Sequence, residues 1–238
     1  KSHWDIPVLI DGITVHFLAS HPTPPVFDGP EDRNGTRNAD EIRFWLDYVS
    51  GQGSYIYDDQ GRRGGLAPGS LFVIMGDQNN DPNDGDGFRS QIRALLDSPL
   101  TNDSTICTPS AEGGFEARLQ GGPTGANALH VGNPRLDTAD FNDAPNASGN
   151  LRTDYVIPAV SNRLECTGAG IFWPAAADPN SPLVGGFGFY PTSLGNGYPS
   201  SDHKLVFVDL QVVPAPAAVL LFGIGAGAVA LGRRRRRS

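Results

Sequence analysis

The chain has 238 residues, of which 39% are hydrophobic and 18% charged, with 30 glycines and 20 prolines. This length allows one large domain or two small ones, and the composition is typical of a soluble globular protein with many turns, not of a helical bundle. The net charge is −8, and outside the arginine run 233–237 thirteen basic side chains face 26 acidic ones, a balance that disfavours non-specific binding to nucleic acid.

The first predicted elements are a strand and a helix. Residues 13–20, ITVHFLAS, alternate apolar and polar side chains as a strand does, and they run into His21. After a proline-rich loop, Asn38 is expected to cap a helix that ends at Gly51 and has acidic residues in its first turn. The apolar face of this helix, at helical spacing, consists of Ile42, Trp45, Leu46 and Val49.

A second strand and a second helix follow. Residues 71–75 are continuously apolar, which predicts a strand buried on both faces. Asp86 is expected to cap a helix that stops before Pro99. Its expected inward side chains are Phe88, Ile92, Leu95 and Leu96.

The remainder of the body carries fewer signals. Residues 100–150 are polar, glycine-rich and without period, which predicts a long loop region. Strands are expected at 154–158, 170–173 and 204–212, with another glycine- and proline-rich loop at 174–203. This order predicts a layered α/β or α+β domain with its site on loops at strand ends.

The two cysteines, Cys107 and Cys166, have no partner at metal-ligand spacing, so a cysteine zinc site is excluded. In an exported protein they would be able to pair across a long loop, whereas in the cytosol they would be bystanders. The residues alone leave both alternatives open.

The segment 72–87, FVIMGDQNNDPNDGDG, ends a buried strand in a run of acidic side chains. A calcium loop of the EF-hand type is excluded, because Pro82 stands where that loop needs glycine and Phe88 where it needs glutamate. A solvated turn accounts for residues 81–87. Asp77 and Asn79, however, point the same way from an extended backbone, which suits the binding of a cation or a phosphate.

Three other strand ends carry groups suited to metal or proton chemistry. His21 follows the first predicted strand, Asp154 opens the segment DYVIP, and Asp202 and His203 precede the last strand. Four strand ends of this kind favour one shared functional site over coincidence.

In this order the segments resemble the endonuclease/exonuclease/phosphatase superfamily, which includes pancreatic deoxyribonuclease and the neutral sphingomyelinases. The resemblance covers residues 1 to about 212 and implies a four-layer α/β/β/α sandwich with two facing sheets. The segments that carry it are ITVHFLASHP, ADEIRFWLDYV, the GDQN box at 76–79, Asp154-Tyr155-Val156 and Ser201-Asp202-His203.

The resemblance also implies roles for individual side chains. His203 would act on the attacking water or bind the phosphate, with Asp154 holding its other ring nitrogen. Asp77 and Asn79 would orient the nucleophile and the phosphate, and His21 would contact the phosphoryl oxygens or assist the leaving group.

The implied cofactor is a divalent cation, Mg²⁺ or else Mn²⁺ or Ca²⁺, with Asp202 taking part in its binding. Arg37 and Arg152 are weaker candidates for binding the phosphate. The asparagine and the principal metal-binding glutamate of the family come from strands that would precede this chain. We therefore expect a domain that is incomplete at its N-terminus, binds metal poorly by itself and has little activity alone.

Residues 213–238 form a second predicted unit. Val213 to Pro216, an apolar segment and the arginine run resemble the PEP-CTERM sorting signal of Gram-negative bacteria. The resemblance implies an exosortase as partner, transient anchoring in the inner membrane through 213–232, and release to the cell surface or extracellular matrix. Residues 1–212 would then be the exported domain.

The sequence thus predicts an exported, divalent-metal-dependent phosphoesterase that hydrolyses a phosphodiester or phosphomonoester by in-line attack of water. Its substrate stays open among nucleic acid, phospholipid head groups and small organic phosphates, and the acidic body favours the last. The alternative is a non-catalytic surface or biofilm-matrix binding protein that keeps the fold.

Overall fold

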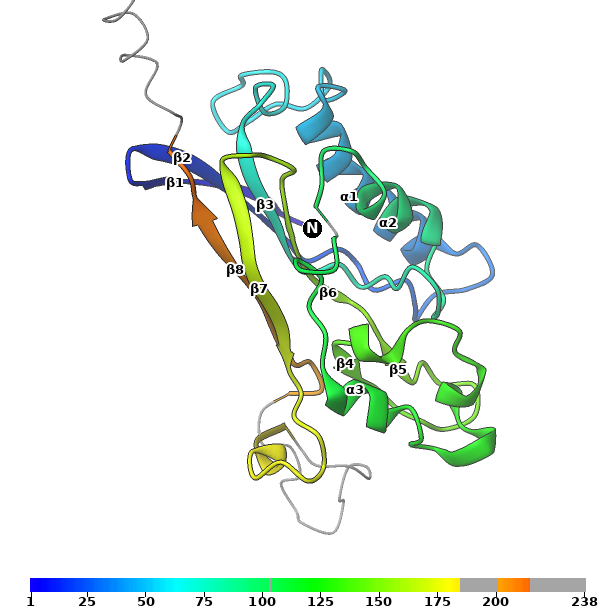
Figure 1. Cartoon of the computed structure of the whole chain (residues 1–238). Coiled ribbons are helices and arrows are strands. Elements are labelled where there is room, and N and C mark those ends of the chain that lie inside the picture. Colours follow the sequence, from blue (N-terminus) through cyan, green and yellow to red (C-terminus); the bar gives the residue numbers. More distant parts are fainter. Residues whose placement is uncertain (103, 185–200, 215–238) are drawn as a thin grey trace, which may run out of the picture.

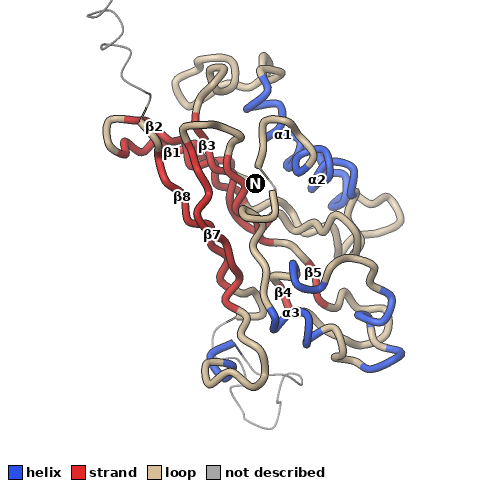
Figure 2. Tube along the Cα trace, in the orientation of Figure 1, coloured by secondary structure: helices blue, strands red, loops and turns tan. Residues whose placement is uncertain are grey.

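The computed structural model describes residues 1–102, 104–184 and 201–214, and these residues form a mixed α/β fold in layers (Figure 1). Helices lie on one side, a four-stranded sheet lies in the middle, and a two-stranded antiparallel ribbon lies on the other side (Figure 2). The prediction of a layered α/β domain is confirmed at this level.

The central sheet has the order β1-β2-β3-β6. Its strands are β1 (His3–Ile10), β2 (Ile13–Ser20), β3 (Leu71–Asp77) and β6 (Asp154–Pro158), and only the β2–β3 pair is parallel. β1, which the sequence did not predict, joins β2 through a two-residue turn. Asp11 and Gly12 of this turn both have positive φ (50° and 79°), as a type I′ hairpin requires.

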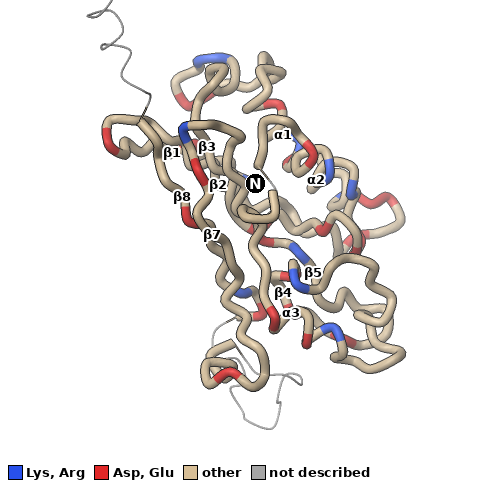
Figure 3. Tube along the Cα trace, viewed as in Figure 1, with Lys and Arg blue, Asp and Glu red and all other residues tan. Residues whose placement is uncertain are grey.

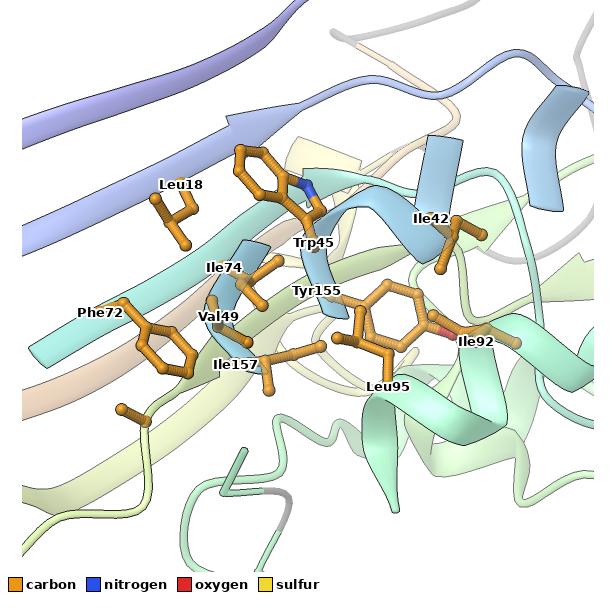
Figure 4. Packing of buried hydrophobic residues seen from close by; sticks show 11 residues of the cluster. Leu18, Ile42, Trp45, Val49, Phe72, Ile74, Ile92, Leu95, Tyr155 and Ile157 are labelled. Atoms are coloured by element: carbon orange, nitrogen blue, oxygen red, sulfur yellow. The ribbon is translucent and has the colours of Figure 1, made fainter. Parts of the chain in front are cut away.

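Helices α1 (Arg33–Ser50) and α2 (Arg89–Leu96) cover one face of this sheet. The core between them is apolar (Figure 4) and confirms the predicted inward positions of both helices apart from Phe88. Its members include Leu18 and Ile74 from the sheet, Ile42, Trp45 and Val49 from α1, and Ile92 and Leu95 from α2.

Both predicted helix starts were wrong. α1 begins five residues before Asn38, which is fully buried and uses its amide for tertiary contacts instead of capping. α2 begins at Arg89 with Phe88 at its N-cap position, so the ring of Phe88 is 44% exposed and Asp86 caps nothing. The predicted end of α1 is confirmed, because Gly51 adopts the left-handed conformation there.

The ribbon of β7 (Leu164–Phe172) and β8 (Leu205–Val212) packs on the other face of the sheet. Leu164, Leu210 and Val212 meet Val15 and Val73 in a second apolar cluster. The outward face of β8 carries Leu205 and Phe207, which are 68% and 43% exposed. In the part of the chain that the structure describes, no helix covers this face, so only three of the four expected layers are present.

Residues 100–150 contain short elements instead of one loop. They are α3 (Glu112–Ala117), the 3-10 turns η1 (Gly122–Thr124), η2 (Ala126–Leu129) and η3 (Pro134–Leu136), and the strand pair β4 (Ala139–Asp140) and β5 (Asn150–Leu151); a further turn, η4, spans Ser181–Val184. Cys107 and Cys166 form a disulfide that ties this region to β7, which answers the question that the sequence left open.

The predicted sorting tail lies outside the described residues from position 215 onward. Within residues 1–102, 104–184 and 201–214, no helix has both the length and the apolar character needed to span a bilayer.

Candidate active site

The ends of three separate segments bring Asp77, Asp154 and His203 together. Asp77 closes β3 and lies opposite Asp154, which opens β6, in the register of the central sheet. His203 stands just before β8 and is positioned by a bridge to Ala139. One ligand atom from each of the three side chains lies within 4.8 Å of the other two. The predicted convergence of these strand ends is therefore present.

His203 is held at one nitrogen and open at the other. Its Nδ1 lies 2.9 Å from Oδ2 of Asp154, and its Nε2 lies 4.0 Å from Oδ2 of Asp77. The hydrogen bond to Asp154 raises the pKa of His203 above its usual value, against the opposing effect of burial. The contact expected between Asp154 and the second ring nitrogen thus exists.

Asp77 is a largely buried carboxylate between two imidazoles. Its Oδ2 lies 3.3 Å from Nε2 of His21, and its Oδ1 accepts from the backbone N–H of Asn79 (2.8 Å). Burial, and then the nearby charge of Asp154, raise the pKa of Asp77. His21 is 61% exposed and lies at the outer edge of the cluster.

The backbone around Asp77 has little freedom. Gly76 has φ +125°, and a Cβ at this position would collide with the backbone oxygen of Ser20 on the neighbouring strand. Asn79 has φ +51° and donates from Nδ2 to the carbonyl of Pro22 (3.1 Å). An amide group has two N–H donors, so a second one remains for a ligand. The function of the GDQN box at 76–79 therefore depends on its backbone conformation as well as on its side chains.

Sequence reasoning missed Thr138, which anchors Asp154. Its Oγ1 donates to Oδ2 of Asp154 (2.8 Å) and accepts from the backbone N–H groups of Thr153 (3.0 Å) and Asp154 (2.9 Å). The hydroxyl of Thr153 donates to the same carboxylate oxygen at 3.1 Å. Thr138 lies in the region predicted as loop, and nothing in its sequence context marks it.

A buried polar network beneath the site was also missed. Asn38 Nδ2 donates to the carbonyls of Thr23 and Gln78, both at 2.9 Å, and Asn38 Oδ1 accepts from Asn80 Nδ2 (2.7 Å). Trp45 Nε1 donates to Ser20 Oγ at 2.7 Å. The network joins α1 to the loop after β3 and so fixes the position of Asp77. The polar residues next to Asp77 in the run GDQNN were the feature of the sequence that could have indicated this network.

The remaining predicted residues do not join the cluster. Asp202 is half-buried beside His203, but it is not among the three side chains whose ligand atoms converge. Arg37 is exposed on α1 and lines a hollow with Arg33 and Phe44. Arg152 is buried, and its guanidinium lies 4.7 Å from the ring centroid of Tyr155. Arg152 is therefore not an exposed side chain, and its role as a phosphate ligand stays a prediction.

The donor set of the cluster fits a divalent cation. Two carboxylates and one imidazole are the oxygen and nitrogen ligands that Mg²⁺, Mn²⁺ or Ca²⁺ accept, and two carboxylates that repel each other gain from a shared positive charge. In the described part of the chain, basic and acidic positions are interspersed along the trace (Figure 3).

Residues 4–203 match the sequence model of the Endonuclease/Exonuclease/phosphatase family, so the chain belongs to this family. Its members are generally hydrolases that act on phosphoester bonds, and they typically depend on a divalent metal.

Two solved structures are similar to the chain. An endonuclease/exonuclease/phosphatase family protein from Leptotrichia buccalis C-1013-b has 14% identity and a TM-score of 0.40, over 87% of this chain and 52% of that one. An endonuclease/exonuclease/phosphatase from Beutenbergia cavernae DSM 12333 has 16% identity and a TM-score of 0.45, over 90% of this chain and 40% of that one. The chain thus spans about half or less of these proteins, and no curated protein matches it.

Proposed function

We propose that this protein hydrolyses a phosphodiester or phosphomonoester by in-line attack of water, with Asp77, Asp154, His203, His21 and Asn79 at the reacting centre. The observation that carries the proposal is the imidazole of His203, which Asp154 holds at Nδ1 (2.9 Å) while its Nε2 faces Asp77. An imidazole that is hydrogen-bonded to a carboxylate at the end of a strand is a competent general base near neutral pH.

Each side chain has a task that its position allows. His203 takes the proton of the attacking water at Nε2, and Asp154 stabilises the imidazolium that forms. The free N–H of Asn79 donates to a phosphoryl oxygen. His21, exposed and 3.3 Å from Asp77, donates to the departing oxygen. A divalent cation held by the carboxylates of Asp77 and Asp154 would neutralise the charge of the phosphate, while Nε2 of His203 stays free to act as the base.

The chain does not bury all of its apolar surface. Trp4 and Ile6 on β1 are 62% and 44% exposed and lie on the same side of the sheet as Val15, which packs under the β7–β8 ribbon. Together with the exposed Leu205 and Phe207 of β8, this supports our proposal that further polypeptide packs on these strands and completes the domain; its contribution of metal ligands rests on the family resemblance. We also propose export, with exosortase processing at the tail, which rests on the sequence of residues 213–238 alone.

The test combines metal binding with turnover. Mn²⁺ binding is followed by electron paramagnetic resonance, and release of p-nitrophenol is measured from bis(p-nitrophenyl) phosphate and p-nitrophenyl phosphate with Mg²⁺, Mn²⁺ or Ca²⁺. We expect weak Mn²⁺ binding that Asp77→Asn weakens further, and turnover that is low in this chain, higher in a protein extended upstream, and abolished by EDTA.

A folded protein, extended upstream, that neither binds Mn²⁺ nor releases p-nitrophenol would contradict the proposal. Metal binding without turnover, also in a protein extended upstream, would favour the alternative of a non-catalytic binding module.

A further inference from the structure

A groove of about 860 Å³ lies between β1, the second half of α1 and the loop 51–70. This volume is in the range of pockets that hold small organic ligands. The described residues that line it do not include Asp77, Asp154 or His203, so the groove is separate from the candidate active site.

Aromatic rings form two sides of the groove. On α1, Phe44 and Tyr48 are half-buried, and their rings stack with centroids 5.9 Å apart and an interplanar angle of 11°. On the loop opposite, Tyr57 is 69% exposed. The loop is held against the helix by a hydrogen bond from the backbone N–H of Leu66 to the carbonyl of Tyr48 (2.9 Å). The guanidinium of Arg63 lies over the ring of Tyr57, 6.0 Å from its centroid, and the ring is otherwise largely open to solvent at the wall of the groove.

The opening of the groove towards β1 carries an ordered polar trio. Asp5 accepts from the hydroxyl of Tyr48 (2.7 Å) and binds Nδ1 of His16 (2.8 Å). Burial and the charge of Asp5 raise the pKa of Tyr48, so its hydroxyl stays protonated as a donor. The contact to Asp5 leaves the other ring nitrogen of His16 as the one available to a ligand in the groove.

The charges that line the groove do not favour an anion. Asp58 pairs with Arg62 at 2.7 Å, and Asp59 and Arg63 add one charge of each sign. With Asp5, the acidic side chains outnumber the arginines. The net negative charge of the groove disfavours a nucleic acid strand, and a purely apolar ligand would offer no partner to the second ring nitrogen of His16.

We propose that this groove binds a neutral oligosaccharide. The apolar faces of sugar rings stack on aromatic side chains such as Tyr57, and sugar hydroxyls both donate and accept, which matches the carboxylates and the imidazole of His16. Binding of this kind needs no phosphate and no metal, so it is independent of the hydrolysis proposed above.

The experiment is calorimetric titration of the full chain with cellohexaose, chitohexaose and mannohexaose, with a short oligothymidylate as the comparison ligand. At least one hexaose is expected to bind, and Tyr57→Ala is expected to weaken it about tenfold. Tyr57 is exposed, so this change leaves the fold intact, as circular dichroism will verify. The matched control is Phe27→Ala, because Phe27 is 95% exposed and does not line the groove.

Retained affinity in Phe27→Ala together with the loss in Tyr57→Ala supports the site. The proposal would be overturned if none of the three hexaoses bound measurably, or if Tyr57→Ala bound a hexaose as tightly as the wild type. If the oligothymidylate binds and Tyr57→Ala abolishes this binding, the ligand of the groove is a nucleic acid and the sugar proposal is wrong.

Discussion

Two groups of largely buried carboxylates, one containing Asp77 and the other Asp81, differ in what compensates their charge. Asp77 and Asp154 at the candidate active site face the imidazoles of His21 and His203. Asp81 instead accepts hydrogen bonds from the backbone N–H groups of Asn83, Asp84 and Arg152. Asp84 accepts from the backbone N–H groups of Val131 and Gly132.

The difference separates the proposed reactive site from a structural cluster. An imidazole can gain or lose a proton near neutral pH, whereas a backbone amide is a fixed dipole. The second group also contains Asp137, which is 8% exposed and whose pKa rises to about 9 through burial and the charges of Asp81 and Asp84. We infer that the first group is built for proton transfer and that the second holds the loop after β3 at a cost in stability.

The largest effect expected on the first group comes from His203→Ala. It removes the proposed base and should lower kcat by about 10²–10⁴-fold with little change in stability. Initial rates with bis(p-nitrophenyl) phosphate measure this loss. Asp137→Asn is the matched control and should leave the rate unchanged; equal losses in both variants would erase the distinction between the two groups.

Asp137→Asn should have the largest effect on stability. The folded-state pKa of about 9 lies above the unfolded value of 3.8, so the native state is destabilised progressively as the pH rises from 4 to 9. The amide cannot ionise, and the variant should therefore be more stable than the wild type by about 2–4 kcal/mol at pH 8 and similar to it near pH 4. Urea unfolding at both pH values measures this difference.

The exposed carboxylate of Asp209 on β8 provides the comparison for that measurement. Asp209→Asn should unfold like the wild type at both pH values. If Asp137→Asn also shows no gain at pH 8, the carboxyl of Asp137 is not penalised in the folded state.

The sequence predicted the elements with a strong pattern. The bounds of β2 are those of the alternating run 13–20, and the apolar run 71–75 gave most of β3, because burial on one or both faces of a strand dictates side-chain type directly. β1 was missed although it pairs with β2 along its whole length. Its side chains are largely exposed, so its sequence carries no core pattern.

The candidate site likewise contains residues that the sequence predicted and residues that it did not. Asp77, Asp154 and His203 were found because each stands at the end of an apolar run. Thr138 and Asn38 were not found as supporting residues, since their partners are 16 and 40 positions away in the chain and only the fold brings them together. The burial of Arg152 against Tyr155 could not be predicted, because a basic side chain gives no sign in sequence of where its guanidinium will pack.

Thr138→Val tests whether the anchoring of Asp154 matters to the first group. It removes a hydroxyl with three hydrogen bonds and should cost about 1–3 kcal/mol of stability. The rate should fall about tenfold, because Asp154 is no longer fixed against His203. Thr138→Ser keeps the hydroxyl and should recover the rate; recovery of stability without recovery of rate would limit Thr138 to a structural role.

The smallest expected effect concerns the pH dependence of kcat/KM, and it depends on what holds His203. The hydrogen bond to Asp154 raises the pKa of His203 above the ordinary histidine value. Because His203 acts as a base only when it is neutral, kcat/KM of the wild type should rise with pH through this raised pKa. Asp154→Asn keeps the shape and removes the charge, which should move this limb to lower pH even as the maximal rate falls. Rate profiles from pH 5 to 9 measure the limb. A limb that stays in place would assign it to Asp77, whose raised pKa also belongs to the first group, and His203 would then bind the phosphate instead of deprotonating the water.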